Sequence, residues 1–302
     1  MRHVLPLMAL LSACSATRGG QPVRLVEDDT GADDTSDTSG GKDTSGGKDT
    51  AGGSDTSDTG DTSDTGDTSD TSDSGDTSDT GGVPERADIL LVVDDSASMQ
   101  LDQSKLAAAF AAFVGPLEAA GSDWRIGVVT TDTDLVIRRG RLVKVAGYAW
   151  IDSSTPNRQA VYEQLVLRGT SGSGTERGLL AAYLAITQPD AEIQTANAGF
   201  LRQDASLDIL VVSDEDDGSA PQVTAADVGA LLEGEAATRG LHVRLSAIVG
   251  PAPTGCTSGS KSASHGPAYL TVATRTGGFT GSICDDDWDP LLAAFAARVL
   301  TP

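Results

Sequence analysis

The chain has 302 residues, and its 44 acidic residues against 21 lysines and arginines give a formal net charge of −23 at pH 7. This acidity argues against nucleic acid as a partner. Only three histidines occur, so no histidine cluster exists to position a catalytic metal of the metallohydrolase kind.

The first residues have the features of an export signal. Arg2 and His3 precede the apolar run 4–11, which is too short to span a bilayer as a helix, so a secretory signal is the better interpretation. The run ends in Leu11-Ser12-Ala13-Cys14, which resembles the bacterial lipobox. Residues 1–14 are therefore predicted to be a lipoprotein signal peptide, with Cys14 as the lipidated first residue of the mature chain.

Two features near this cysteine bear on where the chain is sent. Ordinary cleavage near Ala16, with Cys14 discarded, is the alternative to lipidation. Ser15 follows the cysteine where Asp would signal retention, and in Gram-negative lipoproteins this resembles an outer-membrane sorting signal. We therefore expect an outer-membrane lipoprotein of the cell envelope that is held to the membrane by its lipid alone.

Residues 15–82 are expected to be a disordered tether. From Glu27 to Gly82 the chain is nearly all Asp, Thr, Ser and Gly, with seventeen acidic residues against Lys42 and Lys48. Such a segment buries too little apolar surface to offset the entropy of ordering. A flexible chain of this size spans on the order of 40 Å. The aspartate repeats could also bind calcium, although the regular ligand spacing of a calcium loop is absent.

The remaining residues, 83–302, are enough for one well-buried domain. Apolar runs predict strands at 89–93, 126–129, 207–212, 241–249 and 279–283, and a hairpin at the sheet edge within 135–150. Apolar stripes and caps predict helices at 104–117, 156–167, 176–187, 224–240 and 269–276, and another from Asp289. Thr224 and Gly240 are expected to begin and end the helix between them.

Strands and helices alternate along these residues. Alternation of this kind predicts an α/β fold with a doubly wound, mostly parallel sheet flanked by helices. In such sheets, ligands bind beyond the carboxyl ends of the strands, where the strand order reverses.

Oxygen-bearing side chains lie at these expected strand ends. Asp94-Asp95-Ser96-Ala97-Ser98 directly follows the first strand, Thr175 stands at a helix start after Gly172-Ser173-Gly174, and Asp214 follows the strand 207–212 closely. Hydroxyl and carboxylate oxygens are hard ligands that suit Mg²⁺, Mn²⁺ or Ca²⁺ rather than zinc or copper. The alternative is that these residues serve only as turn and cap residues.

The three elements, in this order, resemble the metal-ion-dependent adhesion site of von Willebrand factor type A domains, and the resemblance covers residues 89–300. It implies a Rossmann-like fold with a metal site made of Asp94, Ser96, Ser98, Thr175 and Asp214. The three hydroxyls would bind the metal directly, and the two carboxylates would act largely through water and orient the hydroxyls. Because the direct ligands are neutral, a free coordination position would attract an Asp or Glu carboxylate from a protein ligand.

The acidic loop after Asp214 departs from the family pattern. The family commonly has glycine soon after this aspartate, whereas here Glu215, Asp216 and Asp217 come before Gly218. These carboxylates could form an accessory calcium-type site, could bind the metal directly and reduce its attraction for an outside carboxylate, or could be a solvated acidic loop.

Two cysteines remain in the domain. In an exported protein, Cys256 and Cys284 are expected to form a disulfide. They follow the last two predicted strands, so parallel strands would bring both cysteines to the edge of the sheet that carries the metal loops.

The expected function is therefore non-catalytic, metal-dependent protein binding on a lipid-anchored tether. Gly169, Gly172 and Gly174 could imitate a phosphate loop, but no Lys-Ser or Lys-Thr follows and the Rossmann spacing is not met. Neither His242 nor His265 accompanies a nucleophile-elbow sequence, so a hydrolase is disfavoured. A periplasmic assembly or sensing factor with the same metal site stays open, and the tether favours display at the cell surface.

Overall fold

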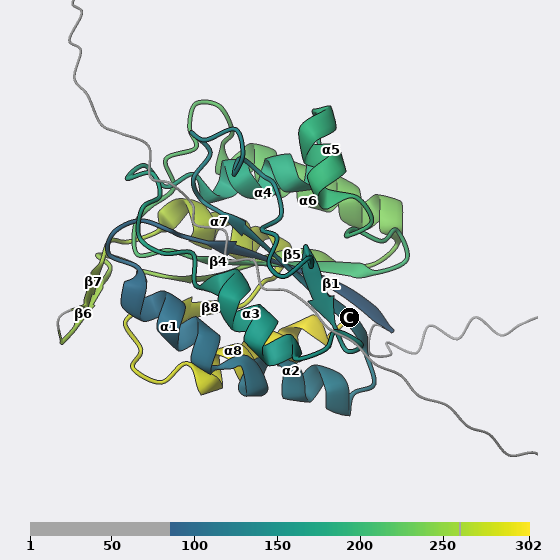
Figure 1. Ribbon diagram of the computed structural model, residues 1–302. Helices are drawn as coiled ribbons and strands as arrows, with labels where there is room; N and C mark the ends of the chain where they lie inside the picture. The colour runs from purple at the N-terminus through teal and green to yellow at the C-terminus, as the bar shows by residue number, and fades with distance from the viewer. Residues whose placement is uncertain (1–84, 260) are drawn as a thin grey trace, which may run out of the picture. The chain divides into compact units, whose positions relative to one another are not determined.

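A six-stranded sheet forms the centre of the part of the chain that the computed structural model describes, residues 85–259 and 261–302 (Figure 1). The strand order is β3-β2-β1-β4-β5-β8, and every neighbouring pair is parallel except β2 with β3. The mostly parallel α/β sheet predicted from the sequence is therefore confirmed. The signal peptide, Cys14 and the tether lie outside the described residues.

The strands coincide with the apolar runs. Residues 89–93 are at most 1% exposed, because a strand in the middle of a parallel sheet is covered on both faces. The strands of the central sheet are β1 (Arg86–Val93), β2 (Asp123–Thr130), β3 (Trp150–Asp152), β4 (Ser206–Val212), β5 (Val243–Val249) and β8 (Thr280–Ser282).

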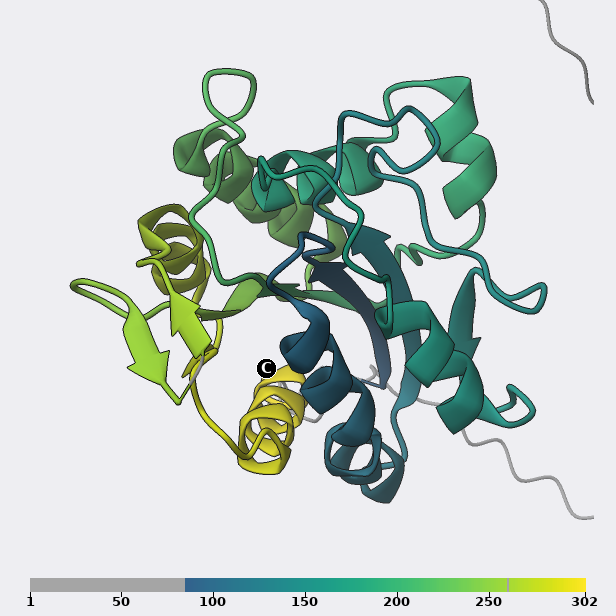
Figure 2. The ribbon, with the colours of Figure 1, turned by 60° about the vertical axis from the view of Figure 1, so that its left-hand side comes forward.

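Helices cover both faces of the sheet (Figures 1 and 2). The residues at alternate positions of β1 point to opposite sides, which creates two separate apolar cores. One core is covered by α1 (Gln100–Ala108), α2 (Phe110–Ala119), α3 (Arg158–Val166) and α8 (Asp289–Val299). The other is covered by α4 (Gly178–Thr187), α6 (Ala225–Arg239) and α7 (Pro267–Thr276).

The caps expected for α6 are present. The Thr224 hydroxyl accepts from the backbone N–H of Asp227, the Asp227 carboxylate accepts from the backbone N–H of Thr224, and Gly240 ends the helix in the left-handed conformation. This reciprocal arrangement satisfies donors that a helix start otherwise leaves free. The sequence signals therefore predicted both ends of α6 correctly.

The predicted edge hairpin within 135–150 is wrong. Only β3 is a strand there, and residues before it form turns with a single isolated bridge between Val145 and Tyr148. Arg138 is drawn to the loops at the strand ends by Asp95 and Asp132. Gly140 has φ +64° and packs so tightly on α4 that an added Cβ would lie 2.6 Å from the Leu184 Cβ. The segment therefore packs on other loops and on α4 instead of pairing with itself.

Two elements were not predicted from the sequence. The short helix α5 (Ala191–Asn197) begins at Asp190, whose carboxylate accepts from two backbone N–H groups. A small antiparallel hairpin consists of β6 (Cys256–Ser258) and β7 (Lys261–Ala263), and it projects beside α1 in Figure 1. Both elements are too short to produce a periodic apolar pattern.

The expected disulfide between Cys256 and Cys284 is present and joins residues 28 positions apart. Because β5 and β8 are parallel, the cysteines that follow them lie at the same edge of the sheet. The bond fastens the β6–β7 hairpin to the segment between β8 and α8. No helix of the described residues is both long and apolar enough to cross a bilayer.

Replacing both cysteines with alanine should lower the free energy of unfolding by about 3 to 4 kcal/mol, because the unfolded chain regains the entropy of an open loop. Urea unfolding of the two proteins, followed by circular dichroism, measures the difference. A loss below about 1 kcal/mol would show that the bond contributes little to stability.

Candidate metal centre

The candidate site lies where the strand order reverses. β1 has β2 on one side and β4 on the other, and its register pairs Val93 with Val212. The Asp94 N–H donates to the carbonyl of Val212 at 3.0 Å, and the Ser213 hydroxyl donates to Asp94 Oδ2 at 2.7 Å. The carboxyl ends of these two strands therefore bring the first and third predicted loops into direct contact.

Hydrogen bonds connect both serines to the two aspartates. Ser96 N–H donates to Asp94 Oδ1 at 2.8 Å, the hydroxyl oxygens of Ser96 and Ser98 lie 3.2 Å apart, and the Ser98 hydroxyl donates to Asp214 Oδ1 at 3.1 Å. A hydroxyl that gives its proton to a carboxylate keeps lone pairs available for a cation. The donor set, hydroxyls oriented by carboxylates, therefore fits a hard divalent ion.

Gln103 of α1 fixes this loop to the glycine-rich second loop. Its buried side-chain amide donates to the carbonyls of Asp94 and Gly169, both at 2.9 Å, and accepts from the Gly169 N–H at 3.1 Å. Gly172 N–H donates to the Asp95 carbonyl at 2.8 Å. An added Cβ at Gly172 would lie 2.3 Å from Asp95 Oδ1, so this close approach requires glycine.

Thr175 lies on the adjacent loop. It is exposed, its N–H donates to the Ser173 hydroxyl at 3.1 Å, and an added Cβ at Gly218 would lie 2.9 Å from its methyl group. Among the described residues its hydroxyl makes no hydrogen bond with Ser96, Ser98 or Asp214. Direct hydrogen bonds and close contacts therefore connect four of the five predicted residues, whereas Thr175 has no hydrogen bond to them.

Glu176 is a site residue that the sequence did not single out. Its carboxyl is buried, Oε2 accepts from the Thr131 hydroxyl, and Oε1 has no partner within residues 85–259 and 261–302. Burial, followed by the nearby charge of Asp94, raises the pKa of Glu176 to about 9, so this carboxyl is protonated near neutral pH. Burial also raises the pKa of Asp94, although hydrogen bonds from Ser213 and Ser96 oppose the shift.

A lysine supplies positive charge on the other side of the site. Lys261 of β7 donates to Asp214 Oδ2 at 2.8 Å and also pairs with the fully buried Asp102 of α1. Lys261 lies in the segment between the two disulfide cysteines, and no motif indicated it. The ammonium group neutralises part of the acidic charge and holds one oxygen of Asp214 while Ser98 holds the other.

Two of the three carboxylates after Asp214 accept hydrogen bonds from the backbone of other segments. Asp217 accepts from the N–H groups of Leu179 and Ser219 at 3.0 and 3.1 Å, and thereby caps the start of α4. Asp216 accepts from the Ala268 N–H at 3.3 Å, and Glu215 is exposed. The described residues contain no group of three or more His, Cys, Asp or Glu side chains arranged to hold a metal. The accessory ion therefore stays a prediction from the sequence.

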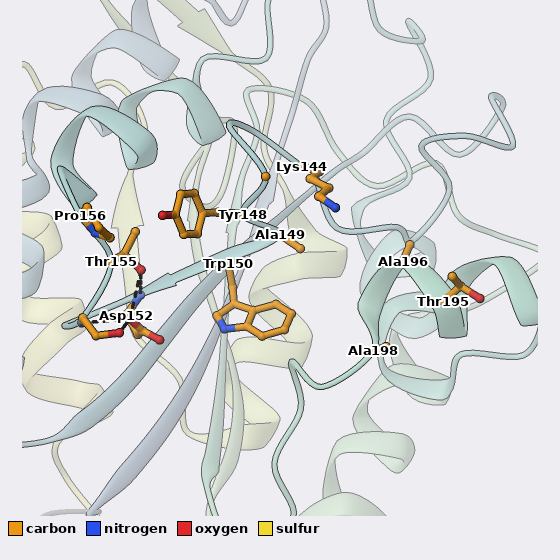
Figure 3. A pocket seen from close by; sticks show the side chains of 12 residues that line it. Lys144, Tyr148, Ala149, Trp150, Asp152, Thr155, Pro156, Thr195, Ala196 and Ala198 are labelled. Atoms are coloured by element: carbon orange, nitrogen blue, oxygen red, sulfur yellow. Dashed lines mark hydrogen bonds between the residues drawn. The ribbon is translucent and has the colours of Figure 1, made fainter. Parts of the chain in front are cut away.

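A pocket of about 620 Å³ lies at the edge strand β3 (Figure 3). It is lined by Tyr148, Trp150 and Lys144 together with side chains from α5 and from the turn after β3. The Asp152 carboxylate accepts from Ser154 and Thr155 and so fixes that turn. None of the predicted metal residues lines this pocket.

Comparison with known proteins does not identify a family. No family model matches the chain, and no curated protein matches it. A solved structure of proximal thread matrix protein 1 from the mussel byssus is similar over 72% of this chain, with 12% sequence identity and a TM-score of 0.42. The match spans 48% of that protein's chain, and it carries no inference about function.

Lys261→Met should increase the affinity for Mn²⁺ about tenfold, because removing a positive charge beside the site strengthens its attraction for a cation. Isothermal titration calorimetry measures the change. Lys105→Met is the matched control, since Lys105 also lies near this end of the sheet but donates to the Asp285 carbonyl at 2.8 Å and not to a carboxylate. Weaker Mn²⁺ binding in Lys261→Met than in the control would show that the lysine chiefly positions Asp214.

Proposed function

We propose that this domain binds another protein through a single divalent cation, as von Willebrand factor type A domains do. Ser96, Ser98 and Thr175 would bind the ion directly, and Asp94 and Asp214 would act through water. Mg²⁺ is the expected ion, with Mn²⁺ or Ca²⁺ as substitutes. The proposal includes the lipid anchor at Cys14 and display from the outer membrane, which rest on the sequence alone.

The observation that carries this proposal is the set of contacts that joins Ser96, Ser98 and Asp214 where the strand order reverses. Side chains 116 positions apart in the sequence are joined by one 3.1 Å hydrogen bond. Ser96 and Asp214 are buried, yet Ser98 is exposed. A cation bound by such hydroxyls would therefore be reachable from solvent on one side.

The expected ligand chemistry follows from charge. Direct ligation by neutral hydroxyls leaves a divalent ion with much of its charge, so an incoming carboxylate adds strong attraction. Lys261 already offsets part of the charge of Asp214. The Asp214 carboxylate therefore neutralises less of the charge of the ion. An Asp or Glu side chain of a protein ligand is therefore expected to occupy a free coordination position of the ion.

The test is a pull-down from native extracts with wild type, Ser96→Ala and Ser104→Ala, each with Mg²⁺ and with chelator. We expect a partner that binds wild type and Ser104→Ala in Mg²⁺ and is lost with chelator or in Ser96→Ala. Ser104 is a suitable control because it is exposed on α1 and its hydroxyl only donates to the Gln100 carbonyl. A partner indifferent to both chelator and Ser96→Ala would rule out recognition through this site.

A further inference from the structure

A second pocket, of about 300 Å³, lies beside the candidate metal centre and is strongly basic. Four of its lining side chains are Arg138, Arg141, Lys144 and Arg168, and its one acidic lining residue is Asp95. A cluster of four basic side chains is unexpected in a chain with a net charge of −23.

The basic side chains are not all neutralised by neighbours. Arg138 pairs with Asp95 at 2.6 Å and with Asp132 at 3.1 Å, and Arg141 pairs with Glu192. The Arg168 guanidinium donates only to backbone carbonyls of Gln164 and Leu167, and Lys144 forms no ion pair within the described part of the chain. The four basic side chains therefore face three carboxylates, and the one net positive charge that remains lies on the side of Arg168 and Lys144.

Several hydrogen-bond donors in the pocket wall also lack acceptors. The Thr130 hydroxyl and the Nε–H groups of Arg141 and Arg168 are buried without a partner among residues 85–259 and 261–302. Buried polar groups are nearly always hydrogen-bonded. An oxyanion bound in the pocket would supply the missing acceptors, once these side chains had moved slightly toward it.

The pocket adjoins the loop that carries the first candidate metal residues. Asp95 follows the metal-site residue Asp94 directly, and its carboxylate binds Arg138. One lining residue, Ile137, ends a run of three exposed apolar side chains, since Leu135, Val136 and Ile137 are 46%, 56% and 74% exposed. Consecutive exposed apolar side chains beside charged groups are typical of protein-binding surfaces.

We propose that this pocket is a second anchoring site for the protein ligand, which receives a carboxylate from an acidic segment while a different carboxylate of that segment reaches the metal. The inference rests on the proposed function. An acidic protein segment is the favoured occupant because both sites select carboxylates and the exposed apolar side chains offer contact to a neighbouring side chain. Inorganic phosphate is also an anion but would leave the exposed apolar side chains uncovered.

The test measures binding of a labelled peptide, Glu-Glu-Leu-Glu-Glu, by fluorescence anisotropy with excess Mg²⁺. Relative to wild type, Lys144→Ala/Arg168→Ala should weaken binding about tenfold or more, since charge-assisted hydrogen bonds are lost. The affinity of this double variant for Mn²⁺ should stay within about threefold of the wild-type affinity. The matched control Arg86→Ala/Arg158→Ala removes the same charge from exposed ion pairs elsewhere, and it should bind the peptide within about twofold of wild type.

The outcomes separate this inference from the proposed function. Peptide binding that is lost in Ser96→Ala but unchanged in Lys144→Ala/Arg168→Ala overturns the second site and leaves the metal site standing. Binding that ignores chelator and Ser96→Ala but is lost in the double variant keeps the basic pocket and contradicts metal-dependent recognition. The inference is also overturned if the peptide does not bind the wild type. It is overturned as well if calorimetry shows that the double variant loses binding of inorganic phosphate but keeps binding of the peptide.

Discussion

The parallel pairing of β1 with β4 is the constraint on which the candidate site depends. These strands carry the chain to opposite halves of the sheet, so the strand order reverses at their carboxyl ends. The in-register pair of Val93 with Val212 then places Asp94 against Ser213. Because the hydrogen-bonded register of β1 with β4 lies between two apolar cores, the packing of the sheet holds these polar groups in place.

The buried carboxyl groups at this end of the molecule also require compensating interactions. Asp94, Asp102, Glu176 and Asp214 are all buried at this end of the sheet, and isolated buried charges are costly. Three different devices reduce that cost: Lys261 pairs with two of the carboxylates, serine hydroxyls donate to Asp94 and Asp214, and Glu176 holds its proton. A divalent ion would add a fourth, which is why this acidic cluster is consistent with a cation site.

Much of the fold could be read from the sequence, and the reasons are local. Unbroken apolar runs such as 89–93 identify buried parallel strands, and Thr224 with Gly240 marks both ends of α6. The candidate site could be foreseen at Asp94, Ser96, Ser98 and Asp214, since each lies in a loop just beyond a strand. Lys261 and Arg138 could not, because their roles depend on which loops meet across the sheet edge. The hairpin expected within 135–150 failed for the same reason: its apolar residues belong to a long-range packing arrangement and to an exposed apolar run.

Anomalous diffraction from crystals grown with Mn²⁺ would show whether a hard cation binds between the first and third loops. We expect one strong manganese peak within coordination distance of the hydroxyls of Ser96 and Ser98, absent from crystals of Ser98→Ala. A wild-type crystal with no peak there, or with manganese bound only to Glu215 and Asp216, would contradict this expectation.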